Sequence, residues 1–434
     1  MKRMKRILLG VGCVLILAIS WLIAITAETD SDKQLALIEK AANYTEDEIY
    51  IRAVPLLEEA IGYNDEYTLQ AEEALKDVYL HLMDQSGYPQ KYTKLLDRQM
   101  TRKDAGQEVF MEAAEYYLSL NKLSDAFQVL RDGITKTGSA DLTALYEKNR
   151  YQYKTERAVY QEVTMTHNGA IQVKQNDSWG LASADGTLIT PCEYEKISTF
   201  SNEQAIVKVG NVISGIDAKG NRIALLHTVA SDFTNFNENR IGLKVESGWI
   251  LADGNFNIGS NVFEEIGMYL NGVAPAKLNG KWGLINISGA EWVLPAEYDE
   301  IIQDELGRSF TQDAVFVRQG EQVRLLSGKD FVGDTYEDAR PFADGWAAVK
   351  KNGRWGFVDA QGVVRIDFQY EDALSFGQHL AAIKQGDYWG YVSLQGKIVI
   401  EPTFLDAKSF YGGSAPVLTE RGWQFITLLE YEGG

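Results

Sequence analysis

The sequence predicts an α+β multidomain protein, in which an N-terminal transmembrane helix and a set of α-helical hairpins precede an all-β repeat array of propeller-like form. Three observations support this class. Residues 7–26 are apolar and uncharged, the apolar spacing over 31–158 follows the 3.6-residue helical period, and a pattern of 33 to 38 residues recurs over 165–434. We therefore expect domains at 1–27, 31–158 and 165–434, the last with about seven to eight units.

Residues 1–27 have the character of a signal anchor. MKRMKR precedes twenty uncharged residues, enough to cross about 30 Å of hydrocarbon at about 1.5 Å per residue. The basic flank is typical of the cytoplasmic side, which predicts a single-pass cell-membrane protein with extracytoplasmic C-terminal domains. Secretion after cleavage of a signal peptide is the alternative, although the small-residue cleavage candidate at 24–26 is poor.

The charge balance argues against a nucleic-acid partner. The chain has 42 Lys and Arg against 61 Asp and Glu, a net charge of −19, and such a surface repels phosphate backbones. Cys13 lies in the apolar N-terminal segment and Cys192 in the repeats, so no disulfide is expected within the rest of the chain. Cys192 is expected to be a small buried apolar filler rather than a reactive thiol.

Residues 31–158 are predicted to form helical pairs separated by turn residues. In the best unit, 106–138, Ala113 and Ala114 are small where two helices must approach closely, and Tyr117 is placed to pack between them. This unit resembles a tetratricopeptide (TPR) repeat, and the resemblance implies a groove for a peptide or protein segment. A role as a stalk or packing partner is the alternative, and residues 143–160 are expected to form the last helix.

The recurring pattern of the C-terminal region is a frame of apolar residues that follows a Trp-Gly pair. An aromatic residue at position 0 is followed by Ala or Ile at +3, an aromatic residue at +6, a small or aliphatic residue at +11 and an apolar residue at +13. Frames begin at 194, 230, 263, 298, 336, 370 and 404. The frame at 298 is interrupted by an insertion near 304–309. The frames at 230, 263 and 336 lack the preceding Trp-Gly.

Each copy is expected to contain antiparallel strands. The side chains of the Trp-Gly segment alternate with the two-residue period of a strand. This segment is followed by a turn that has Ser, Asp or Asn at its first position and Gly at its fourth, as in 359–362. Pro191, Pro295 and Pro402 in the next extended segment predict an edge strand or a strand end. A copy is thus a three- or four-stranded unit that needs its neighbours to bury its apolar side.

These residues resemble the bacterial WG-repeat (KWG) proteins over about 170–425. The pairs that carry the resemblance are Trp179–Gly180, Trp282–Gly283, Trp355–Gly356 and Trp389–Gly390. The resemblance implies no established catalytic activity and no cofactor. The chain enters the array mid-unit and leaves it mid-unit, so the two ends can complete one shared blade. We expect a closed ring, which protects strand edges, and an open curved β-solenoid is the alternative.

Catalytic and metal-binding patterns are absent from the sequence. The four His residues have no metal-ligand spacing, and neither a phosphate-binding Gly-rich loop nor a nucleophile elbow is present. The Trp residues beside Gly are expected to be core rather than a sugar-binding platform. We therefore predict no cofactor, no metal and no enzyme activity.

Carboxylates recur just after the first frame aromatic, which in a repeat fold places them on one face. This acidic row comprises Glu195, Glu264, Glu265, Asp299, Glu300, Glu337, Asp338, Glu371, Asp372 and Asp406. The row could bind a cationic partner, a polyamine or divalent ions; alternatively, its members are solvated turn residues that keep an exposed edge unpaired.

The function predicted is that of a non-enzymatic, extracytoplasmic binding or scaffold protein. The β domain and the TPR-like groove would engage a protein or a cell-envelope polymer. The alternatives are an envelope glycan-processing enzyme, which would need two carboxylates converging in one pocket, and a purely structural spacer.

Overall fold

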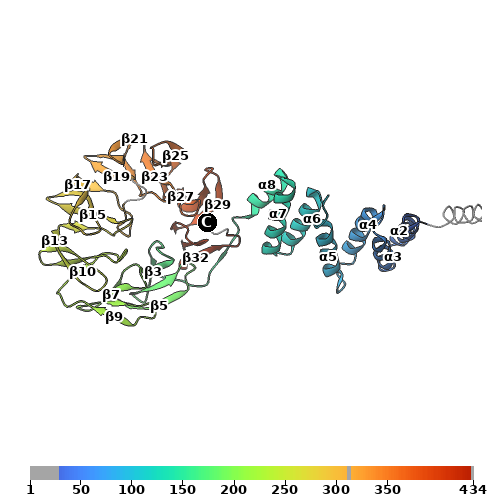
Figure 1. The fold of residues 1–434 in the computed structure, drawn as a ribbon, viewed down its shortest axis with the longest axis horizontal. Coiled ribbons are helices and arrows are strands. Elements are labelled where there is room, and N and C mark those ends of the chain that lie inside the picture. The colour runs from blue at the N-terminus through green and yellow to red at the C-terminus, as the bar shows by residue number, and fades with distance from the viewer. Residues whose placement is uncertain (1–28, 310–313, 432–434) are drawn as a thin grey trace, which may run out of the picture. The chain divides into compact units, whose positions relative to one another are not determined.

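The structure, a computed structural model, describes residues 29–309 and 314–431 (Figure 1). The chain divides into two compact units, one ending at Tyr146 and the other beginning at Glu147. The first unit is helical, and the second is almost entirely β-structure. Each unit is therefore described by itself below.

The helical unit consists of consecutive short helices that pack as antiparallel neighbours. Within the described residues these are α2 (Asp30–Glu46), α3 (Tyr50–Tyr63), α4 (Thr68–Leu80), α5 (Tyr88–Met100), α6 (Gln107–Ser119), α7 (Leu123–Thr137) and α8 (Ala140–Asn149). Thr29 and Asp32 form a capping box at the start of α2, and Gly138 takes a left-handed conformation that ends α7. Ala113 and Ala114 are fully buried, as expected for closely packed helices, while the resemblance to TPR repeats stays a prediction.

One local prediction in this region is wrong. The helix predicted over 143–160 ends at Asn149, and Tyr153–Thr155 form a strand instead. The reason is tertiary, because that strand pairs with the distant C-terminal segment.

The predicted membrane localisation is corrected by the structure. Among the described residues, no helix is both long and apolar enough to traverse a bilayer, so the single-pass anchor has no support. The segment for which the anchor was predicted, 7–26, lies outside the described residues.

The β unit is an eight-bladed propeller, which confirms the predicted closed ring (Figure 1). Each blade is a four-stranded antiparallel sheet. Blades 1 to 4 comprise, from the ring centre outward, β2 (Glu162–Val163), β3 (Ala170–Gln175), β4 (Ser178–Ser183) and β5 (Leu188–Tyr194); β6 (Lys196–Ile197), β7 (Ala205–Val209), β8 (Val212–Ile216) and β9 (Arg222–Leu225); β10 (Asp232–Phe233), β11 (Ile241–Val245), β12 (Gly248–Ala252) and β13 (Ile258–Phe263); and β14 (Glu265–Ile266), β15 (Val273–Leu278), β16 (Lys281–Asn286) and β17 (Trp292–Tyr298).

The remaining blades repeat this order. Blades 5 to 8 comprise β18 (Glu300–Ile301), β19 (Ala314–Gln319), β20 (Gln322–Ser327) and β21 (Asp330–Tyr336); β22 (Asp338–Ala339), β23 (Trp346–Lys351), β24 (Arg354–Asp359) and β25 (Val364–Tyr370); β26 (Asp372–Ala373), β27 (Leu380–Gln385), β28 (Tyr388–Ser393) and β29 (Ile398–Phe404); and β30 (Asp406–Ala407), β31 (Ser414–Thr419), β32 (Gly422–Leu428) and β1 (Tyr153–Thr155). The ring closes where β1 pairs antiparallel with β32, so both ends of the β unit share blade 8, as predicted.

The sequence copy and the blade are out of phase. The Trp-Gly strand and the extended segment after it are the third and outer strands of one blade, whereas the frame that follows begins the next blade. Frame residues therefore pack between neighbouring blades. One such core joins Trp355 and Phe357 of blade 6 to Ala373, Phe376 and Ile383 of blade 7.

The Trp-Gly pair is explained by the outer strand. Trp355 on β24 lies opposite Tyr370 on β25 and is buried. Between Trp355 and Phe357 the register shifts, which brings the backbone of β25 over Gly356. A Cβ at Gly356 would lie 2.7 Å from the carbonyl oxygen of Ile366, so a side chain does not fit there. The predicted edge position of the prolines is confirmed, because all three lie on outer strands: Pro191 on β5, Pro295 on β17 and Pro402 on β29.

Candidate functional site: the central cavity and the acidic row

Four members of the acidic row, each directly after the first frame aromatic, hold hairpin turns. The carboxylates of Glu195, Glu264, Asp299 and Glu337 accept hydrogen bonds from the backbone amides of Gly210, Gly280, Gly320 and Gly353, at 2.7, 3.0, 2.7 and 3.1 Å respectively. Asp299 also binds Lys281 at 2.5 Å, and these bonds from Lys281 and Gly320 lower the pKa of Asp299 below its ordinary value. Glu371 lies 3.5 Å from the guanidinium of Arg354.

The second member of each pair faces a cation. Glu265 and Glu300 form cross-strand ion pairs of 2.7 Å with Lys277 and Arg318 in the same blade. Asp338 and Asp372 lie 3.6 and 3.4 Å from Arg318 and Arg340 of the preceding blades. Asp406 accepts a bond from the amide of Ala407. The carboxylates thus recur at equivalent positions in the ring, where most serve turns and blade contacts; ligand binding by the row stays a prediction.

A cavity of about 580 Å³ lies at the ring centre. It is built from the segments that follow the innermost strands of blades 5 to 8, together with two residues of blade 1. Its lining comprises Met165, Thr166, Gln303, Asp304, Glu305, Arg308, Arg340, Pro341, Phe342, Ala343, Asp344, Leu374, Ser375, Phe376, Gly377, Gln378, Lys408, Ser409, Phe410 and Tyr411. Apolar and charged groups therefore share one concave surface, the usual composition of a binding site.

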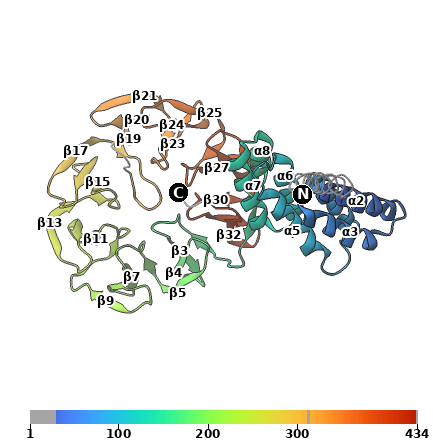
Figure 2. The same cartoon turned by 45° about the vertical axis from the view of Figure 1, so that its right-hand side comes forward.

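The insertion near residue 304 forms one wall of this cavity, and Figure 2 shows the segment after β18 reaching into the middle of the ring. Asp304 shapes the insertion, because its carboxylate accepts bonds from the amides of Leu306 and Arg308 at 2.9 and 3.0 Å. The carbonyl of Gly307 accepts a bond from the amide of Met268 in blade 4 at 2.8 Å. The carbonyl of Leu306 accepts one from the Asn235 side chain in blade 3 at 3.1 Å.

Charged groups of the insertion reach blades 1 and 8. The Glu305 carboxylate lies 2.5 Å from Nζ of Lys408 in blade 8. The Arg308 guanidinium pairs with Asp304 at 2.6 Å and lies 3.3 Å from Nδ1 of His167 in blade 1. Burial lowers the pKa of His167 and the charge of nearby Arg308 lowers it further, and together they outweigh the Asn237 side chain, which favours the protonated ring. His167 is therefore neutral at pH 7, and its ring can accept a bond from Arg308 at Nδ1.

The carboxylates of the cavity are already engaged. Asp304 is bound to Arg308, Glu305 to Lys408, and Asp344 accepts a bond from the amide of His379 at 2.9 Å. A general acid needs a carboxyl that holds its proton near neutral pH, whereas an adjacent cation favours the charged form. No group of three or more His, Cys, Asp or Glu placed to hold a metal occurs in the described residues.

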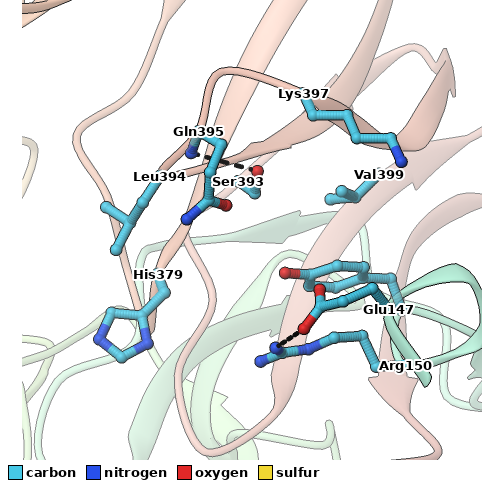
Figure 3. Close-up of a pocket in the computed structure, with 9 residues that line it drawn as sticks. Glu147, Arg150, His379, Ser393, Leu394, Gln395, Lys397 and Val399 are labelled. Atoms are coloured by element: carbon cyan, nitrogen blue, oxygen red, sulfur yellow. Dashed lines mark hydrogen bonds and ion pairs between the residues drawn. The ribbon is translucent and has the colours of Figure 1, made fainter. Parts of the chain in front are cut away.

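Smaller hollows are present elsewhere in the described residues, and one in each unit is lined by charged side chains. Figure 3 shows one of about 400 Å³ in the β unit, where Arg150, His379 and Lys397 line the same space and Arg150 pairs with Glu147 at 2.8 Å. In the helical unit, a groove of about 540 Å³ is lined by Tyr92, Gln107, Glu108, Met111, Glu112, Glu115, Tyr116 and Asp141. Glu112 of that groove is fixed by Lys76 at 2.6 Å and by the Tyr92 hydroxyl at 2.8 Å.

The sequence analysis missed the central cavity. Most of its lining falls at frame positions +4 to +8, where only the aromatic residue at +6 belongs to the recurring frame and the other positions carry no motif of their own. The available signal was the insertion at 304–309, the one place where the predicted frame is interrupted by extra residues. Cys192, expected to be a filler, is half-buried with its sulfur 3.7 Å from the Val173 carbonyl, and burial raises its pKa.

Several solved structures resemble the chain at low identity. A crystal structure of a eukaryotic initiation factor is 9% identical with a TM-score of 0.41, covering 58% of this chain and 78% of that one. YCF48 bound to D1 peptide is 12% identical with a TM-score of 0.30, covering 62% of this chain and 99% of that one. The Neurospora crassa Pan2 WD40 domain is 10% identical with a TM-score of 0.33, covering 63% of this chain and 90% of that one. Likeness at this level says nothing about function. No curated protein matches the chain.

A family of repeats matches the β unit by sequence. The family is described as "WG containing repeat", and it matches residues 179–212, 252–282, 282–321, 335–355, 355–389 and 389–423. Four of the six segments begin at the Trp of a Trp-Gly pair, at residues 179, 282, 355 and 389, so these matches follow the sequence copy and not the blade. The matched segments of the β unit are WG repeats.

Proposed function

We propose that this protein is a non-enzymatic binding or scaffold protein whose WG-repeat domain receives a segment of a protein partner in the central cavity. The observation that carries the proposal is the cavity itself, about 580 Å³, to which five of the eight blades contribute. Its mixture of apolar side chains and a few charged groups is suited to a peptide, because apolar contacts supply affinity and charged groups fix orientation.

The carboxylates of Asp304 and Glu305 in the cavity already form ion pairs, which favours a binding function over glycan processing. A glycosidase needs one carboxyl to donate a proton, and Asp304 and Glu305 are each within 2.6 Å of a cation that stabilises the ionised form. The groove of the helical unit is a second candidate surface for a protein segment, since it combines carboxylates with Tyr92, Met111 and Tyr116.

The test is selection of phage-displayed random nonapeptides on the full chain, followed by binding measurements with two variants. Leu374→Trp fills the cavity and is expected to abolish binding of the selected peptides. Val363→Trp, at an exposed position in a turn outside the cavity lining, is the matched control and is expected to retain it. Peptides that bind Leu374→Trp as well as they bind the unaltered chain would contradict the proposal.

A further inference from the structure

We infer that the central cavity recognises an isolated carboxylate on its partner segment, held between Arg340 and Lys408, and that Glu305 occupies this place when the partner is absent. The inference rests on the proposed function and specifies the chemistry of its ligand. It begins from a charge pattern that the repeat does not require.

Arg340 and Lys408 occupy frame position +4 in blades 6 and 8, with Leu374 at the same position in blade 7 between them. All three line the cavity. The same position in the other five blades is uncharged: Thr164, Ser198, Thr234, Gly267 and Ile302. Two cations are therefore placed on one side of the ring in a chain whose net charge is −19.

Each cation is held against an aromatic ring of its own blade. The guanidinium carbon of Arg340 lies 4.8 Å from the Trp355 ring centroid, and Nζ of Lys408 lies 5.5 Å from that of Trp423. Such contacts keep a cation in place while leaving other directions open to an anion. Nε of Arg340 is buried and has no hydrogen-bond partner among the described residues, and the contact of Arg340 with Asp372 is long, at 3.4 Å.

Lys408 is paired differently from the other blade cations. Lys277 and Arg318 pair with carboxylates on the strands beside them, whereas Lys408 pairs with Glu305, which is carried by the insertion that reaches in from blade 5. The Glu305 side chain is 36% exposed, so it is accessible to replacement by another carboxylate. We interpret Glu305 as an internal stand-in for the partner's Asp or Glu side chain.

An acidic peptide segment fits better than a polyanion. Leu374 and Met165 place apolar surface beside the cations, which suits a peptide with apolar residues flanking one carboxylate. A polymer with a charge on every unit would be repelled by the acidic remainder of the protein, within a screening length of about 8 Å at physiological ionic strength.

The experiment uses the full chain and two libraries of hexapeptides, acetylated and amidated so that the termini carry no charge. One library has Glu fixed at the third position and Ala, Leu, Ser or Tyr elsewhere; the other has Gln at the third position. Retention is measured by equilibrium dialysis and mass spectrometry. We expect the Glu library to be retained about tenfold more strongly, since a charge-assisted hydrogen bond is lost with Gln.

Three variants test which residues bind the carboxylate and which residue competes with it. Lys408→Gln and Arg340→Gln are each expected to bring retention of the Glu library down to that of the Gln library. Glu305→Gln is expected to raise it about threefold or more, because the internal competitor is removed. Lys384→Gln is the control, since it removes the same charge at a strand position opposite Trp389 and outside the cavity lining. Unchanged urea midpoints confirm that the variants fold.

The outcomes separate the inference from the proposed function. Equal retention of both libraries would overturn the carboxylate inference and leave peptide binding in place. Retention of neither would overturn both. Displacement by polyglutamate without any preference for the Glu library would identify a polyanion site and overturn the inference. A Glu preference that is unaltered in Glu305→Gln would contradict the stand-in role of Glu305.

Discussion

At some positions of the repeat, the residue type is determined by the backbone that passes beside it. The Gly after each repeat Trp is required because the shifted outer strand crosses it: a Cβ at Gly180 would lie 2.7 Å from the Thr190 carbonyl oxygen, and one at Gly390 would lie 2.5 Å from that of Ile400. The sequence pattern identified the pair, but its reason depends on a register shift that no local pattern reports.

Gly356→Ala should therefore destabilise the β unit by about 1–3 kcal/mol, the usual cost of overpacking a rigid site. The measurement is urea unfolding followed by Trp fluorescence. Gly259→Ala, in outer strand β13, is the matched control, because its nearest neighbour would be 3.6 Å away and its stability should change by less than about 0.5 kcal/mol. Equal effects of the two substitutions would contradict the explanation.

Asp359 offers a test through pH. Its carboxylate accepts bonds from the amides of Gln361 and Val363 at 3.0 Å each and binds Arg365. Burial alone would raise the pKa of Asp359, but these bonds prevail and lower it. The stabilisation is thus present above the unfolded pKa, near 3.8, and is lost as the pH falls through the lower folded value.

Asp359→Asn should accordingly cost about 1–2 kcal/mol at pH 7 and progressively less as the pH falls below the unfolded pKa of about 3.8. Urea midpoints of both proteins measured between pH 3 and pH 7 check this expectation. A difference in stability that stays constant over this range would show that the carboxylate charge is not the cause.

At the scale of elements, the blade is not the unit that the sequence repeats. The period, the strand alternation and the type I turns were predictable, because each depends on residues near one another in the chain. The division of every copy between two blades was not predictable, since it depends on which strands pair across the sheet. The course of the insertion was equally unpredictable, because its contacts with Asn235, Met268 and Lys408 join distant parts of the chain.

The closing strand β1 gives a prediction at this scale. The amide of Glu156 donates to the Phe425 carbonyl at 2.7 Å, and bonding alternates along an antiparallel edge. Glu156→Pro removes that bond and should destabilise the β unit by about 1–3 kcal/mol. Thr155→Pro, one residue earlier on the outward side of the edge, should be tolerated within about 1 kcal/mol. Thermal unfolding of both variants provides the measurement; similar losses would argue against ring closure through these bonds.

For the whole molecule, the composition and the repeat predicted a closed β ring after a helical region, and the structure has both. The localisation drawn from the N-terminal segment did not gain support from the described residues. The cores of the two units are separate, since the helical core contains no residue of the propeller blades. The candidate site could not be predicted from the repeated positions, because its distinctive residues are those at which the copies differ.

Separate cores predict separate unfolding. A fragment of residues 150–434 should have the same free energy of unfolding as the β unit of the intact chain, within about 0.5 kcal/mol. Urea unfolding can be followed by Trp fluorescence, because every Trp of the described chain lies between 179 and 423. A large loss of stability in the fragment would instead show that the β unit depends on the helices.

The shared blade also has a consequence for biosynthesis. On the ribosome, Thr155 is made about 270 residues before its partner strand begins at Gly422, a delay on the order of 15–50 s at typical elongation rates. Throughout that interval the nascent chain carries an unpaired strand, and proteolytic removal of β32 would leave β1 unpaired again in the mature protein.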